Sequence, residues 1–143
     1  MTQAWQAFAL TTVALFFKMF LTAGVQGLVR VRSRTFVNPE DAACFGRTPQ
    51  AAADHPVAER AQRALRNDLE NVPIFLFLAL AYVQLGCWET GALLYFPVFV
   101  LARALHTIAF VRPTQPLRNR AYLVGVLVSM ILSGHIVATI VGG

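Results

Sequence analysis

The sequence predicts an all-α membrane protein: one domain over residues 1–143, folded as a bundle of four transmembrane helices. Of the 143 residues, 57% are hydrophobic and 13% are charged, and the mean hydropathy is +0.57. This balance lies outside that of ordinary soluble domains. A spanning helix needs about 20 mostly apolar residues. Four segments meet that need: 5–29, 72–85 with an extension backward, 91–111 and 121–141.

Basic residues are distributed unevenly between the connections. The connection between the first two spans holds Arg30, Arg32, Arg34, Arg47, Arg60, Arg63 and Arg66, and the one between the last two holds Arg112, Arg118 and Arg120. The N-terminus, the connection over 84–90 and the C-terminus carry no Lys or Arg. The positive-inside rule therefore predicts that both termini lie outside and both basic connections lie in the cytosol.

The first apolar segment is expected to be a retained span. It has no basic residue before Lys18, and its apolar length exceeds that of a typical signal-peptide core. Lys18 stands near its middle, where a lysine is expected to snorkel to the interface or to face the bundle interior.

The first connection is predicted to be a cytosolic loop over 30–41, ending in the turn-type sequence Asn38-Pro39-Glu40-Asp41. A helix is then expected to start at Asp54-His55-Pro56, with Asp54 as its cap. Its run to Leu85 would be about 45 Å long at 1.5 Å per residue, against a hydrocarbon core of about 30 Å. The first third of this helix must therefore protrude from the membrane or line its cytosolic side. Pro73 and Pro97 are expected to kink their helices.

Several function classes find no support in the sequence. The arginines sit beside spans and lack interleaved aromatic residues, so anionic lipid or a small anionic substrate is a better expected partner than nucleic acid. No metal site is expected, because His55, His106 and His135 are isolated. Cys44 and Cys87 fall on opposite membrane faces and cannot pair with each other.

The polar run at 59–71 continues directly into the second span. Arg63, Arg66, Asn67 and Glu70 stand at i, i+3, i+4 and i+7, so they share one helix face, which Arg60 extends by a turn. One interpretation is a self-satisfied set of ion pairs from Arg63 or Arg66 to Glu70. The other is a ligand site, because a surplus of positive charge remains that a ligand with carboxylates would neutralise.

Other polar groups are predicted to reach the same cytosolic end: Arg30 from the first span, His106 from the third, and Arg118 with Tyr122 from the fourth. Arg118 and Tyr122 are four residues apart and lie on one helix face. Taken singly, Tyr122 is typical of an interfacial aromatic belt and His106 of a packed interior. Their combination favours a functional site.

These residues carry a resemblance to a known family that covers nearly the whole chain, in order. The matching segments are Phe36-Val37-Asn38-Pro39-Glu40-Asp41, Phe45-Gly46, Val57-Ala58-Glu59-Arg60, Arg63-Ala64, Asn67-Asp68-Leu69-Glu70-Asn71, His106-Thr107-Ile108-Ala109, and Pro116-Leu117-Arg118 ahead of Tyr122. With them the chain resembles the membrane-associated proteins in eicosanoid and glutathione metabolism (MAPEG), in particular microsomal glutathione transferases and prostaglandin E synthase.

The resemblance implies a four-helix subunit, a homotrimer, and glutathione bound between subunits near the cytosolic face. It implies that Arg118 is catalytic by stabilising the glutathione thiolate, and it aligns Asp41 with an aspartate discussed as catalytic, although Asp41 equally suits a role as a loop cap. The implied glutathione-binding residues are Arg30, Arg63, Arg66, Asn67, Glu70, His106, Asn119 and Tyr122.

Three positions depart from the animal members of the family. Phe110 stands where a tyrosine is common, Leu65 where a histidine is common, and Asn119 where prostaglandin E synthase has serine. These departures weaken the transfer of any particular eicosanoid activity, while the basic cluster is retained.

The expected activity is that of a glutathione transferase or peroxidase acting on lipophilic electrophiles or lipid hydroperoxides from the bilayer. The alternatives are a non-catalytic lipid-binding or scaffold protein of the same fold, and an isomerase similar to prostaglandin E synthase. The expected location is a bacterial inner membrane, or the endoplasmic reticulum in a eukaryote, with the active site toward the cytosol.

Overall fold

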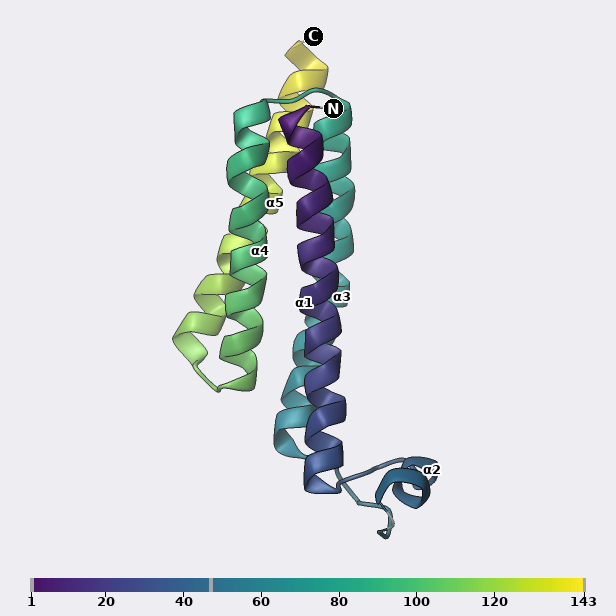
Figure 1. Cartoon of the computed structure of the whole chain (residues 1–143). Helices are drawn as coiled ribbons and strands as arrows, with labels where there is room; N and C mark the ends of the chain where they lie inside the picture. Colours follow the sequence, from purple (N-terminus) through teal and green to yellow (C-terminus); the bar gives the residue numbers. More distant parts are fainter. Residues whose placement is uncertain (1, 47, 143) are drawn as a thin grey trace.

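The computed structural model describes residues 2–46 and 48–142, and Arg47, one of the basic residues of the first connection, lies outside them. The described residues form helices and connections without a strand. The long helices are α1 (Gln3–Ser33), α3 (Pro56–Gln84), α4 (Glu89–Val111) and α5 (Gln115–Gly142). A short α2 (Pro39–Asp41) runs into a π-helical turn, Ala42–Gly46. In Figure 1 the long helices run side by side, both termini lie at the upper end, and α2 lies at the lower end.

Three of the long helices, α1, α4 and α5, are long and apolar enough to cross a membrane. The all-helical membrane fold is thereby confirmed, and the first, third and fourth predicted spans fall within these three helices. α3 is not in this set, since its first half carries the charged run from Glu59 to Glu70. A membrane crossing by α3 stays a prediction, although its second half matches the expected apolar segment.

The start of α3 differs from the sequence prediction by one residue. His55 is the cap, and its Nδ1 accepts a hydrogen bond from the backbone N–H of Val57. Asp54 instead accepts from the backbone N–H of His55 and from the side chain of Arg30. Because the Asp54 carboxylate is engaged by Arg30, the neighbouring imidazole supplies the cap. Pro56 opens the helix, as expected, and α3 continues through Pro73 as α4 does through Pro97.

The first connection is shorter than predicted, because α1 stays helical to Ser33 and so includes Arg30 and Arg32. Helix α1 ends at Arg34, which takes the left-handed conformation (φ 52°) and donates its backbone N–H to the Arg30 carbonyl. The predicted turn at 38–41 is the first turn of α2, whose cap is Asn38. In Figure 1 the lower ends of α1 and α3 extend past the α4–α5 connection.

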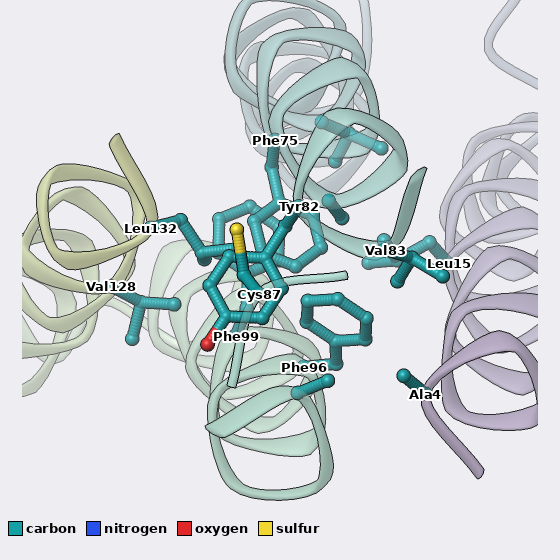
Figure 2. Close-up of a cluster of buried hydrophobic side chains, with 13 residues drawn as sticks. Ala4, Leu15, Phe75, Tyr82, Val83, Cys87, Phe96, Phe99, Val128 and Leu132 are labelled. Atoms are coloured by element: carbon teal, nitrogen blue, oxygen red, sulfur yellow. The ribbon is translucent and has the colours of Figure 1, made fainter. Parts of the chain in front are cut away.

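The apolar core lies in the upper half of the bundle and is drawn in Figure 2. Phe75 of α3 lies parallel to Phe99 of α4, with 3.6 Å between ring centroids, and meets Phe96 edge-on. Leu132 of α5 is also fully buried. By contrast, Phe16 and Phe20 of α1 are more than half exposed. An apolar outer surface of this kind is typical of a helix that faces lipid or a neighbouring subunit.

At the upper end, polar contacts join the helix ends. The Tyr82 hydroxyl lies 2.9 Å from the Trp88 carbonyl and 3.1 Å from Nδ1 of His135, and Oε1 of Glu89 accepts from the backbone N–H of Ala4. Cys87, in the connection between α3 and α4, is buried, while Cys44 is exposed in the turn that follows α2. The two cysteines therefore lie at opposite ends of the bundle, unpaired as predicted.

Cys44 gives a test of the predicted orientation, because a membrane-impermeant thiol reagent reacts only with accessible thiols. With Cys44 in the cytosol, we expect labelling in inverted vesicles and in detergent, and none in right-side-out vesicles. Cys87 is too buried to serve as the reporter, so the Cys44→Ser variant is the control that assigns the signal. Labelling of Cys44 in intact right-side-out vesicles would contradict the orientation.

Candidate functional site

A basic pocket of about 400 Å³ lies at the lower end of the bundle, between α3 and the α4–α5 connection. Its lining residues are Arg60, Arg63, Phe110, Pro113, Gln115 and Arg118. Three guanidinium groups thus line the pocket without a carboxylate among them. Two helices far apart in the sequence supply these charges, Arg60 and Arg63 from α3 and Arg118 from α5. A pocket with this charge is suited to a small anion that carries carboxylates or another acidic group.

Arg118 is held over an aromatic ring within this pocket. Its guanidinium carbon lies 4.8 Å from the centroid of Phe110, which is a cation–π contact. Phe110 is the position at which the sequence departs from the tyrosine common in animal relatives, and the contact with Arg118 does not use a hydroxyl. Such contacts fix a guanidinium in place while its N–H groups remain able to donate to an anion.

His106 and Tyr122 extend the site toward the bundle interior. The His106 ring lies 5.6 Å from Phe110 and 6.2 Å from Tyr122, measured between centroids. His106 is 3% exposed, and its Nδ1 has no hydrogen-bond partner among the described residues. Tyr122 is partly exposed. The predicted neighbourhood of His106, Arg118 and Tyr122 is therefore present within a single chain.

The polar face of α3 forms only weak internal ion pairs. Arg63 pairs with Glu59 at 3.4 Å, and Nε of Arg66 lies 3.9 Å from Glu70, with all four side chains at least half exposed. Exposed pairs of this kind contribute about 0–1 kcal/mol. This geometry argues against a tightly self-satisfied network on the exposed face and leaves the arginines available to a ligand.

Asn67 and its neighbour Asp68 face a different partner, which the sequence reasoning missed. Nη2 of Arg103, on α4, donates to Oδ1 of Asn67 at 2.7 Å and to Oδ1 of Asp68 at 2.6 Å, and Nε donates to the same Asp68 oxygen at 3.0 Å. Lys18 of α1 donates to the other oxygen, Oδ2. Asp68 is 0% and Arg103 1% exposed. Arg103 is the only charged residue in the third predicted span, and a charge within an apolar span is the signal by which the sequence could have identified it.

The remaining predicted residues lie apart from the pocket lining. Arg30 is paired with Asp54, with Nη2 of Arg30 2.5 Å from Oδ2 of Asp54. Asp41 accepts from Nδ2 of Asn38 at 3.0 Å, a contact that suits a loop cap. Asn119 is exposed on the first turns of α5. Within the described residues there is no group of His, Cys, Asp and Glu that would hold a metal ion.

Long apolar helices with a charge network buried among them are the features of an integral membrane protein, and this one has a basic pocket at one end of its bundle. Comparison with known proteins identifies the family: the MAPEG family model matches residues 8–138, and the chain belongs to this family. The chain is 42% identical over 126 residues to prostaglandin E synthase of Equus caballus, covering 87% of this chain and 82% of the relative.

Two further relatives indicate the same grouping. Prostaglandin E synthase of Macaca fascicularis is 41% identical over 120 residues, or 83% of this chain and 78% of the relative. Microsomal glutathione S-transferase 1 of Mus musculus is 39% identical over 124 residues, or 83% of this chain and 79% of the relative. The resemblance noted in the sequence is thereby confirmed.

The Arg30–Asp54 pair predicts a pH-dependent contribution to stability. The hydrogen bond from Arg30 holds the pKa of the Asp54 carboxyl below its ordinary value. This contribution is therefore fully present above the ordinary carboxyl pKa of about 4 and is lost as the pH falls through the lowered value. We expect Asp54→Asn to reduce the stability at pH 7 by about 1 kcal/mol or less, because Arg30 is partly exposed.

The measurement is the thermal unfolding midpoint in detergent at pH 7 and at pH 3. The difference between wild type and Asp54→Asn should shrink at the lower pH. Glu40→Gln, which alters an exposed carboxylate on α2, is the matched control and should lack this pattern. An Asp54→Asn difference that stays constant with pH would contradict the assignment.

Proposed function

We propose that this protein is a glutathione-dependent transferase or peroxidase that binds glutathione at the basic pocket and uses its thiolate on lipophilic substrates from the bilayer. The observation that carries the proposal is the joint lining of one pocket by Arg60, Arg63 and Arg118. Glutathione brings two carboxylates, one ammonium and a thiol. Arginine forks match the carboxylates, and Glu70, exposed one helical turn beyond Arg66, suits the ammonium.

The fold and the relatives support this chemistry. Family members named for glutathione transfer and for prostaglandin E synthesis share about 40% identity with the chain. In this proposal the remaining polar residues, Arg30, Arg66, Asn67, Asn119 and Tyr122, complete the site together with His106. Arg30 lies on α1, away from the pocket lining, which suits the family-based expectation that three subunits form the sites between them.

The catalytic role falls to Arg118. A free thiol has a pKa of about 8.5, and only the thiolate is an effective nucleophile. A guanidinium beside the sulfur favours the anion, and a lowering of the thiol pKa by two units corresponds to about 2.7 kcal/mol. In the transfer reaction the sulfur forms a bond to the electrophilic carbon, and the leaving group departs with its electron pair. A protein nucleophile is not required, and the assignment of Asp41 as a second catalytic residue stays a prediction.

A prostaglandin-type isomerase is the second candidate, favoured by the names of the relatives. The hydroxyl that a tyrosine would supply is missing at Phe110, and Asn119 replaces serine. Both departures weaken the transfer of a particular eicosanoid activity to this chain. We therefore place the transferase or peroxidase first. We also propose that α3 crosses the membrane in addition to α1, α4 and α5, and that the site faces the cytosol.

Arg118→Ala tests the thiolate assignment. Purified protein with glutathione should develop the ultraviolet absorbance of a thiolate and should turn over a chlorodinitrobenzene-type electrophile. The variant should lose most of the thiolate signal, with a fall of about 25-fold in the thiolate fraction at pH 7 if the thiol pKa returns from about 6.5 to about 8.5. Arg120→Ala, an exposed arginine two residues further along α5, is the control and should retain the signal. Normal turnover by Arg118→Ala would contradict the role.

Glu70→Ala separates binding from activation. Loss of the partner for the glutathione ammonium should weaken glutathione binding, which equilibrium dialysis measures directly. At saturating glutathione the thiolate signal should return, because Arg118 is unchanged. If the variant binds glutathione as tightly as wild type, Glu70 is not part of the glutathione site. Wild-type protein without glutathione binding or thiolate absorbance would refute the proposed function as a whole.

A further inference from the structure

The buried contacts of Asn67 determine how its amide group is oriented. Arg103 is a donor only, so the atom of Asn67 that it contacts at 2.7 Å must be the amide oxygen. The amide group is planar, and its nitrogen lies on the other side of the side-chain carbon from the bound oxygen. Nδ2 of Asn67 makes no hydrogen bond within the described parts of the chain, and Asn67 itself is partly exposed. Its two N–H groups therefore remain available to a ligand.

Arg103 cannot rotate to release the amide oxygen without breaking other buried contacts. Its Nε and Nη2 both donate to Oδ1 of Asp68, at 3.0 Å and 2.6 Å. Asp68 is held in turn through its second oxygen by Lys18. Because all three side chains are at most 10% exposed, water offers little substitute for these bonds. The chain of contacts from Lys18 through Asp68 and Arg103 fixes Asn67 from three helices.

We propose that Arg103 is a positioning residue that holds the Asn67 amide with its N–H groups toward the bound peptide, so that position 67 selects a hydrogen-bond acceptor on the ligand. This inference rests on the proposed function and assigns a role to a residue outside the pocket lining. The acceptor is a carboxylate or carbonyl oxygen of glutathione. Without the bond from Arg103 the Asn67 amide oxygen could turn toward this acceptor and repel it, and restoring the productive orientation would cost part of the binding free energy.

A double-mutant cycle on glutathione affinity tests this inference. Arg103→Lys retains the positive charge beside Asp68 but lacks the fork that reaches both Asp68 and Asn67. We expect this change to raise the glutathione Kd about tenfold, the scale of one charge-assisted hydrogen bond. In an Asn67→Ala background the same change should alter the Kd less than twofold, because the amide that Arg103 orients is gone.

Arg112→Lys is the matched control, since Arg112 is an exposed arginine just beyond the end of the same helix. It should leave the Kd unchanged. Unfolding midpoints measured on each variant identify those that remain folded. An equal factor from Arg103→Lys in both backgrounds would mean that Arg103 acts on the fold alone, and would overturn the proposal.

Asn67→Asp provides a test that leaves Arg103 intact. The new carboxylate still accepts from Arg103, so the bundle should stay folded, but it has no N–H group for the ligand. We expect the glutathione Kd to rise at least tenfold. Binding as tight as that of wild type would overturn the donor role while leaving the proposed function standing. Wild-type protein that does not bind glutathione would overturn both.

Discussion

The fold depends on one carboxylate shared by two cations inside the bundle. Asp68 of α3 receives Lys18 from α1 and Arg103 from α4, and it is fully buried. Charged groups at membrane depth are tolerated when they pair with one another, since lipid supplies no hydrogen bonds. The contact therefore constrains the relative positions of three helices. Removing Asp68 leaves two buried cations without a counter-charge, which is more costly than the complete network.

The length of α3 connects this network to the basic pocket. The helix is 29 residues long, so its charged first half extends past the apolar core drawn in Figure 2. Asn67 connects the two regions. It comes directly after the arginine-rich turns of α3, and its side chain accepts a hydrogen bond from Arg103 of the buried network. The buried network thus joins the helices. Through Arg103 it also fixes the orientation of Asn67, one of the residues proposed to bind glutathione.

Much of the fold followed from the sequence, because apolar length and helical spacing are local properties. The positions of the long helices were predicted, and the cysteines are unpaired as expected. The cap at His55 was missed, since a distant side chain, Arg30, engages Asp54. Arg103 was missed for the same reason: helical spacing places a residue on a face but does not identify the helix opposite. The neighbourhood of His106, Arg118 and Tyr122 was predicted because the topology brings the lower ends of α4 and α5 together.

The stability of an Asp68→Asn variant shows whether the shared carboxylate holds α1, α3 and α4 together. This change keeps the size of the side chain and removes its charge, so Lys18 and Arg103 lose their common partner. We expect a loss of about 3–5 kcal/mol in unfolding free energy in detergent, or failure to fold. Glu70→Gln, which alters an exposed carboxylate two residues away on the same helix, should change it by about 0.5 kcal/mol or less. An Asp68→Asn protein as stable as wild type would contradict the claim that this carboxylate holds the three helices together.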